Sequence, residues 1–184
     1  MWKTIVMAAL AVGTLLAQEC TWRVKDVEVK WEAFKTPARI GVGGTFGNIK
    51  LSAKPDKSKK GLLEGAKVVI ETASVDTKNA GRDAKLVKSF FKVQGVDRIE
   101  AVVTQVRDGS LDVNVTMNGV SRIVPMKSEW EGDEVEAEGW IDLGDFDMLP
   151  SLRAINKACY DKHAGKTWQE VKLEFELKTV EKCK

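Results

Sequence analysis

Histidine occurs only once in this chain of 184 residues, as His163. One histidine excludes a multi-histidine metal centre and argues against Ser–His or Cys–His hydrolase chemistry. An excess of one charge is also missing, since 29 lysines and arginines nearly balance 27 aspartates and glutamates. A nucleic-acid-binding protein normally carries a basic excess on one face, so we expect no nucleic-acid partner. The composition, 43% hydrophobic and 30% charged, is typical of a globular protein.

Long apolar runs are absent except at the N-terminus, where Thr4 to Ala17 follows the basic Lys3. This run is short for a membrane span and ends in a small residue, which predicts a secretory signal peptide over residues 1–17 and a periplasmic location. An uncleaved N-terminal anchor is the alternative. A lipoprotein signal is disfavoured because Glu19 precedes Cys20. Without linkers or repeats, residues 18–184 are expected to form one domain.

Cysteine is scarce as well, with three residues in the chain. In an oxidising compartment an odd number permits at most one internal disulfide and leaves one thiol over.

Apolar and polar residues alternate through most of the remaining chain. Leu111, Val113, Val115 and Met117, for example, are separated by polar residues. This pattern predicts antiparallel strands with one buried face, and turn pairs such as Asn118–Gly119 favour tight hairpins. Strands are expected near 21–31, 38–51, 66–73, 97–107, 110–118, 121–131, 134–142 and 168–180. Such short, evenly spaced strands indicate a barrel or a sandwich.

Two segments instead have helical spacing. In residues 80–91 and 148–164 the apolar residues recur every three or four positions. Both segments are predicted to be helices inserted into a mainly β chain.

Four segments, in this order and spacing, resemble the YceI-like proteins: GVGGTFGNIKLS (41–52), ASVDTKNAGRDAKLVKSFF (73–91), LDVNVTMNGVSRIVPM (111–126) and IDLGDFDM (141–148). The resemblance covers nearly all of residues 18–184. It implies an eight-stranded antiparallel, lipocalin-like barrel with two inserted helices. It also implies a non-enzymatic periplasmic protein that carries a polyisoprenoid, a quinone, or a fatty acid or amide inside the barrel. No cofactor is expected beyond the bound lipid.

The residues alone leave open whether side chains fill the barrel, and the resemblance favours a cavity. Residues in phase with the apolar faces of strands and helices are expected to line or close it: Phe46, Ile70, Leu86, Phe90, Phe91, Ile99, Val103, Val113, Val115, Met126, Trp140, Phe146 and Leu152. A shift of one residue in a strand would exchange its two faces.

In an up-and-down barrel the first and last strands pair antiparallel. Cys20 begins the first strand and Cys183 follows the last. A Cys20–Cys183 disulfide is therefore predicted, with Cys159 as the remaining thiol. A bridge from Cys159 to Cys20 or Cys183 is the alternative.

Cys159 and His163 lie four residues apart on a predicted helix, a spacing that suits two metal ligands. No third ligand is identifiable, so no metal site is predicted, and a redox or metal-handling function remains the alternative. Phosphate-loop, dinucleotide and nucleophile-elbow motifs are incomplete or absent. The basic run 54–60 is interpreted as a solvated turn, with a phosphate contact or a transient membrane contact as the alternative. A homodimer is left open.

Overall fold

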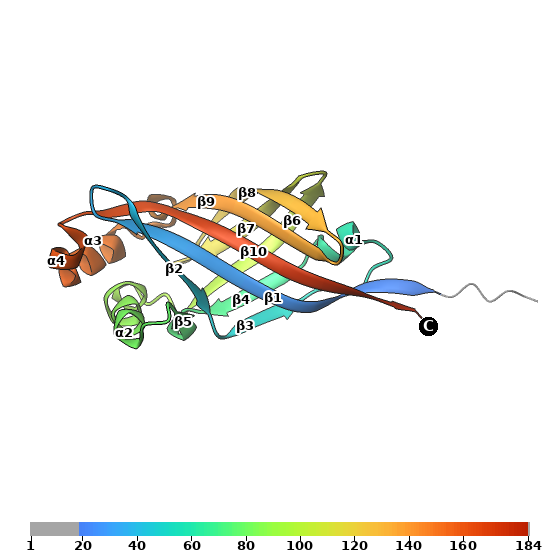
Figure 1. The fold of residues 1–184 in the computed structure, drawn as a ribbon, viewed down its shortest axis with the longest axis horizontal. Helices are drawn as coiled ribbons and strands as arrows, with labels where there is room; N and C mark the ends of the chain where they lie inside the picture. The colour runs from blue at the N-terminus through green and yellow to red at the C-terminus, as the bar shows by residue number, and fades with distance from the viewer. Residues whose placement is uncertain (1–18, 184) are drawn as a thin grey trace, which may run out of the picture.

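The computed structural model describes residues 19–183, so the predicted signal peptide (1–17) lies outside the described residues. Ten strands form one antiparallel sheet in the order β3-β4-β6-β7-β8-β9-β10-β1-β2-β5. The sheet curls around a hydrophobic core (Figure 1). Between residues 19 and 183, no helix is both long enough and apolar enough to cross a membrane.

Most strands that are neighbours in the sheet are also consecutive in the chain. Their bounds are β1 (Cys20–Lys35), β2 (Ile40–Phe46), β3 (Ile49–Ser52), β4 (Lys67–Glu71), β5 (Val75–Asp76), β6 (Arg98–Arg107), β7 (Ser110–Met117), β8 (Val120–Glu131), β9 (Glu134–Asp142) and β10 (Thr167–Cys183).

The predicted mainly β, antiparallel fold is confirmed, but the strand count is ten and not eight. The segment expected as one strand over 38–51 divides into β2 and β3 at Gly47–Asn48. Before this bend β2 pairs with β1, whereas after it β3 pairs with β4. The two-residue strand β5, which pairs with the end of β2, is the second addition. It is too short to produce an alternating pattern.

The alternation of apolar and polar residues explains the hairpin of β7 and β8. In β7 every second residue is buried, and the β7–β8 ladder places Val113 opposite Val124. Asn118 and Gly119 form the turn with φ angles of 53° and 74°. Positive φ at both central positions matches the right-handed twist of the two strands.

The helices lie at the two ends of the sheet (Figure 1). The elements α2 (Ala80–Ser89), α3 (Leu149–Ala158) and α4 (Tyr160–His163) gather at one end, and α1 (Lys59–Leu63) lies at the other. Short 3₁₀ turns are η1 (Thr72–Ser74), η2 (Phe91–Val93) and η3 (Leu143–Phe146). The second predicted helix, 148–164, is interrupted at Cys159.

The basic run 54–60 is not entirely a turn, because its last two residues begin α1. Leu62 and Leu63 of this helix are buried. Lys59 bonds to the carbonyl of Gly132 in the β8–β9 turn, and its ammonium lies 4.3 Å from the centre of the Trp22 ring. These contacts hold α1 across this end of the sheet.

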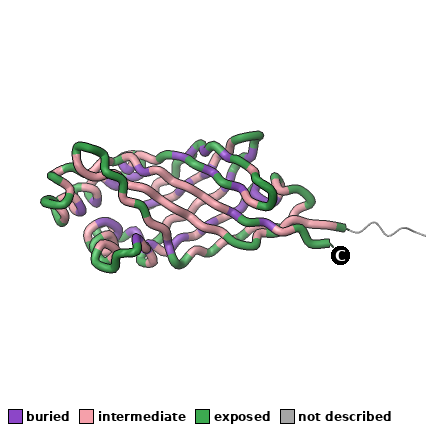
Figure 2. The backbone as a smooth tube through the Cα atoms, viewed as in Figure 1, coloured by how far each residue is buried: buried purple, intermediate pink, exposed green. Residues whose placement is uncertain are grey.

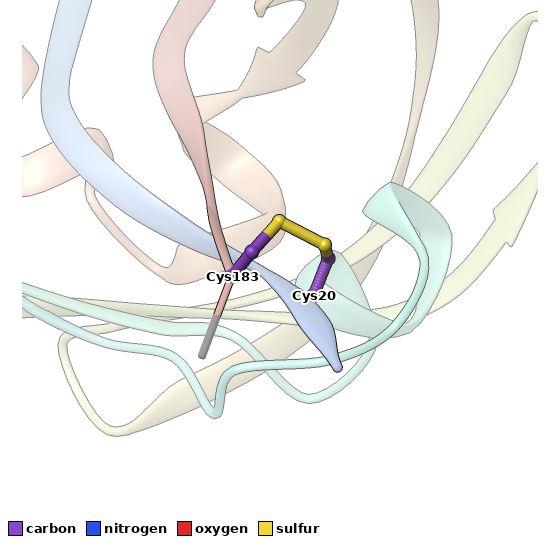
Figure 3. The surroundings of a disulfide bond; sticks show 2 residues. All are labelled: Cys20 and Cys183. Carbon is purple, nitrogen blue, oxygen red and sulfur yellow. A yellow bond between two sulfur atoms is a disulfide. The ribbon is translucent and has the colours of Figure 1, made fainter. Parts of the chain in front are cut away.

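The first and last strands pair along nearly their whole length, as predicted. Cys20 lies opposite Cys183 in this ladder, and the two form the predicted disulfide (Figure 3). Trp22 and Asp56 add a bridge that ties β1 to the segment after β3.

Burial is uneven around the sheet (Figure 2). The inner residues of β7 and β9 are almost fully buried, whereas β1 has no residue in the buried class and β10 has few. Inner side chains of β1 and β10 therefore border empty space and are not fully packed.

Candidate functional site

A cavity of about 500 Å³ occupies this space within the curled sheet. Its wall is mainly apolar and combines inner residues of β1, β2, β4, β6–β10 with residues of α2 and α3. Among them are Val29, Trp31, Val68, Ile70, Val103, Leu111, Val113, Met126, Ile141, Leu173 and Phe175. A volume in this range is typical of small-molecule sites.

Three phenylalanines form one corner of the wall, where β2 meets the end of α2. The rings of Phe90 and Phe91 meet edge to face at 5.1 Å, and Phe46 lies 6.4 Å from Phe91. Edge-to-face packing suits the quadrupoles of the rings and fixes this corner.

Trp31 places its indole against β2 at a position where there is no side chain. A Cβ at Gly44 would lie 2.8 Å from the Trp31 ring, so glycine makes the close approach possible. The indole nitrogen of Trp31 is buried and has no hydrogen-bond partner within residues 19–183.

The cavity reaches the surface between α2 and α4. Asn79, Gly81, Lys85 and Lys162 line it, although all four are exposed. This opening, which we call the mouth, lies at the helical end of the sheet (Figure 1). The other end is covered by α1 and tied by the disulfide.

Charge at the mouth is mostly positive. Lys35 from β1, Lys85 from α2 and Lys162 from α4 line the cavity, together with Arg82. The acidic lining residue, Glu174, is ion-paired with Lys172 at 2.8 Å.

His163 lies at the mouth and is part of a defined hydrogen-bond chain. The side-chain amide of Asn156 donates to the carbonyl of Gly165, so its oxygen is left to accept from the Thr167 hydroxyl at 3.0 Å. The Thr167 oxygen lies 2.8 Å from Nδ1 of His163 and can accept its proton. The neutral ring is therefore assigned as the Nδ1–H tautomer, which leaves Nε2 as an acceptor.

Partial burial lowers the pKa of His163, and the charges of Lys35 and Lys85 lower it further. Both effects disfavour the imidazolium form. The influence of lysines from two different elements indicates that their charges converge on this point.

Cys159 also lines the cavity and is not in a disulfide. Within the described residues, the one group of three side chains with metal-ligand spacing is Glu134, Glu136 and Glu176, which lacks both Cys159 and His163. The described part of the chain thus gives these two residues no third protein ligand.

The structure brings together at the cavity wall eleven of the thirteen residues expected there: Phe46, Ile70, Leu86, Phe90, Phe91, Ile99, Val103, Val113, Val115, Met126 and Leu152. Phe146 differs, because it is buried in the adjacent core and does not border the cavity.

The expectation for Trp140 is wrong. Its side chain is 49% exposed and stacks against Phe34, with ring centres 5.8 Å apart. Gly139, opposite Met126, occupies the inward position, so Trp140 points outward. A Cβ at Gly139 would lie 2.9 Å from the Met126 side chain, which shows why a small residue stands there.

Two groups of lining residues were not predicted from the sequence. Trp31, Leu173 and Phe175 share the phase of alternating strands and could have been found from that pattern. The mouth residues Lys35, Lys85 and Lys162 could not, because separated lysines look like ordinary surface residues until the fold brings them together.

Comparisons with known proteins agree with this architecture. The model of the YceI-like domain matches residues 22–179. BcnA of Burkholderia cenocepacia has a TM-score of 0.60 at 17% identity, covering 86% of this chain and 99% of that one.

Two further structures are similar. A polyisoprenoid binding domain from Saccharophagus degradans, implicated in plant cell wall breakdown, has a TM-score of 0.60 at 13% identity, covering 89% of this chain and 98% of that one. The Campylobacter jejuni YCEI protein has a TM-score of 0.52 at 19% identity, covering 78% and 85%. A search of curated proteins found no match.

Proposed function

The chain belongs to the YceI-like domain family, and from this premise we propose that it is a non-enzymatic lipid-binding or carrier protein. A polyisoprenoid or another long-chain amphiphile, such as a quinone, a fatty acid or a fatty amide, would occupy the interior of the sheet. The apolar cavity of about 500 Å³ is the observation that carries the proposal.

The cavity suits a chain because its titratable lining groups lie mainly at one end, whereas its deep wall consists of Val, Ile, Leu, Met and Phe side chains. Burying apolar surface is favourable without directed bonds, at about 0.8 kcal/mol per CH₂ group. The Saccharophagus degradans domain, which shares the fold, is described as polyisoprenoid binding and so supports this ligand class.

A homologous series of saturated alcohols tests the chain-binding site. We expect affinity to rise about four-fold per added CH₂ group and to stop rising once the chain fills the cavity. Displacement of a fluorescent apolar probe measures this. Affinity that does not depend on chain length would contradict a chain-binding cavity.

Native mass spectrometry tests for a resident ligand. The protein is expected to carry an adduct that organic solvent extracts and that matches a lipid mass. A lipid-free protein that also fails to take up any member of the alcohol series would overturn the proposal.

We also propose export to the periplasm through residues 1–17. The Cys20–Cys183 disulfide supports an oxidising compartment. The intact mass of the exported protein is expected to correspond to cleavage between Ala17 and Gln18. A mass that retains these residues would favour the anchor instead.

A further inference from the structure

We propose that the mouth of the cavity selects amphiphiles with an anionic headgroup, a carboxylate or a phosphate, and that Lys35, Lys85 and Lys162 make this selection. The inference rests on the proposed lipid-binding function and adds the chemistry of the ligand's polar end.

The three lysines come from three separate elements, β1, α2 and α4, yet all line the same cavity. Within residues 19–183 none of the three forms an ion pair, whereas ten other basic residues do. Three cations without an ion-pair partner thus border one apolar cavity, where they would attract an anionic group.

Arg82 adds a fixed positive charge. Its guanidinium donates to the Thr77 hydroxyl and the Thr77 carbonyl, each at 2.8 Å. Asp83 accepts from the backbone nitrogen of Thr77, so its carboxylate is held at the base of α2. Glu174 already pairs with Lys172. Glu174 is the one acidic side chain among the residues that line the cavity, so the lining carries an excess of positive charge.

The half-buried His163 reports on this field, because the charges of Lys35 from β1 and Lys85 from α2 both lower its pKa. Its ring lies where a headgroup would sit when the chain fills the cavity below.

The orientation of the ligand follows. The wall beneath the mouth is apolar, and the opposite end is covered by α1. An amphiphile would therefore insert its chain first and leave its headgroup among the lysines. Anionic membranes could also attract these lysines, but lysines that line the cavity face a headgroup directly.

Pairs of ligands with one chain and two headgroups test the proposal. We suggest hexadecanoate against 1-hexadecanol, and geranylgeranyl phosphate against geranylgeraniol, with affinities from probe displacement at low salt. The anionic member of each pair is expected to bind roughly ten-fold more tightly. Inorganic phosphate and acetate alone are expected not to displace the probe.

The variant Lys35→Gln/Lys85→Gln/Lys162→Gln should abolish this preference and leave the affinity for the alcohols unchanged. Retained alcohol binding also shows that the variant is folded. The matched control Lys88→Gln/Lys92→Gln/Lys157→Gln removes the same charge from exposed lysines outside the lining and should keep the preference.

The outcomes distinguish a failure of the headgroup inference from a failure of the proposed lipid binding. If alcohols and anionic ligands bind equally, or if the triple variant keeps the preference, the headgroup inference is overturned while lipid binding stands. If no amphiphile binds, lipid binding itself fails. If the triple variant loses only its binding to anionic phospholipid vesicles, the lysines serve a membrane surface and the inference is overturned.

Discussion

Cys20 and Cys183 face each other as partners in the β1–β10 ladder, and a disulfide joins them across it. The bond encloses almost the whole described chain, with a sequence separation of 163 residues. It lies at the end of the sheet away from the mouth (Figure 1). The backbone ladder and the covalent bond thus hold the same pair of chain ends together.

Removing this bond should lower stability strongly. Chain-entropy reasoning gives a loop of this length roughly 5 kcal/mol, and native disulfides commonly contribute about 2–5 kcal/mol. The Cys20→Ser/Cys183→Ser variant is expected to lose stability in this range, measured by urea unfolding. Cys159→Ser is the matched control and should unfold almost as the native protein does. Non-reducing peptide mapping that placed Cys159 in a disulfide would overturn the pairing.

A charge placed inside the wall should abolish binding. Val113 is buried and borders the cavity, so Val113→Arg would bury an unpaired guanidinium or unfold the sheet. Ile123 on the adjacent strand is 56% exposed. Ile123→Arg is therefore the control and should retain ligand. A folded Val113→Arg protein that keeps its co-purifying lipid would contradict the assignment of this wall.

The thiol of Cys159 in the cavity lining should be dispensable. A chain-binding cavity needs volume and apolar walls and not a thiolate, so Cys159→Ser should bind the same ligands with less than about a two-fold change in affinity. Native mass spectrometry of both proteins checks this. Loss of a bound metal or of a redox response in the variant would instead support the metal or redox function.

Stability should depend on pH through His163. Because the folded protein lowers its pKa, the unfolded chain binds this proton more readily. The contribution of the neutral ring is complete above the unfolded value of about 6.5. It is lost as the pH falls through the lower folded pKa. Since the chain has one histidine, a single ring signal in NMR titration reports the folded value. A folded pKa at or above about 6.5 would contradict the expectation.

An anionic ligand should reverse this shift. A carboxylate at the mouth stabilises the imidazolium form, so the pKa of His163 should rise on binding hexadecanoate, while 1-hexadecanol should not raise it. By linkage, hexadecanoate then binds more tightly as the pH falls between the bound and free values. The variant His163→Gln should lose this component of the pH dependence.

The strands were predictable because one buried face produces a period of two. Most strand bounds, such as 134–142 for β9, agree with the sequence pattern. The bend at Gly47–Asn48 was not predicted, although the apolar phase shifts there by one residue, from Val42 and Phe46 to Ile49 and Leu51. Local patterns report which residues face inward and not which strand lies alongside.

Trp140 shows that the sequence pattern does not decide for every residue whether its side chain faces inward. Its size favours burial, but the small Gly139 is the residue whose position faces Met126. The packing of the opposite strand, which the local sequence does not encode, decides between the two neighbours. The same holds for the break at Cys159, since an apolar face continues through it.

The covered end of the sheet determines the path of ligand exchange. Lys59 holds α1 across one end and the disulfide joins the chain ends there, so for the proposed carrier we expect a ligand to enter and leave through the mouth. The polar end of the ligand would then be the last part to enter and the first to leave. Delivery to an acceptor would begin with a hand-over of that polar end at α2 and α4.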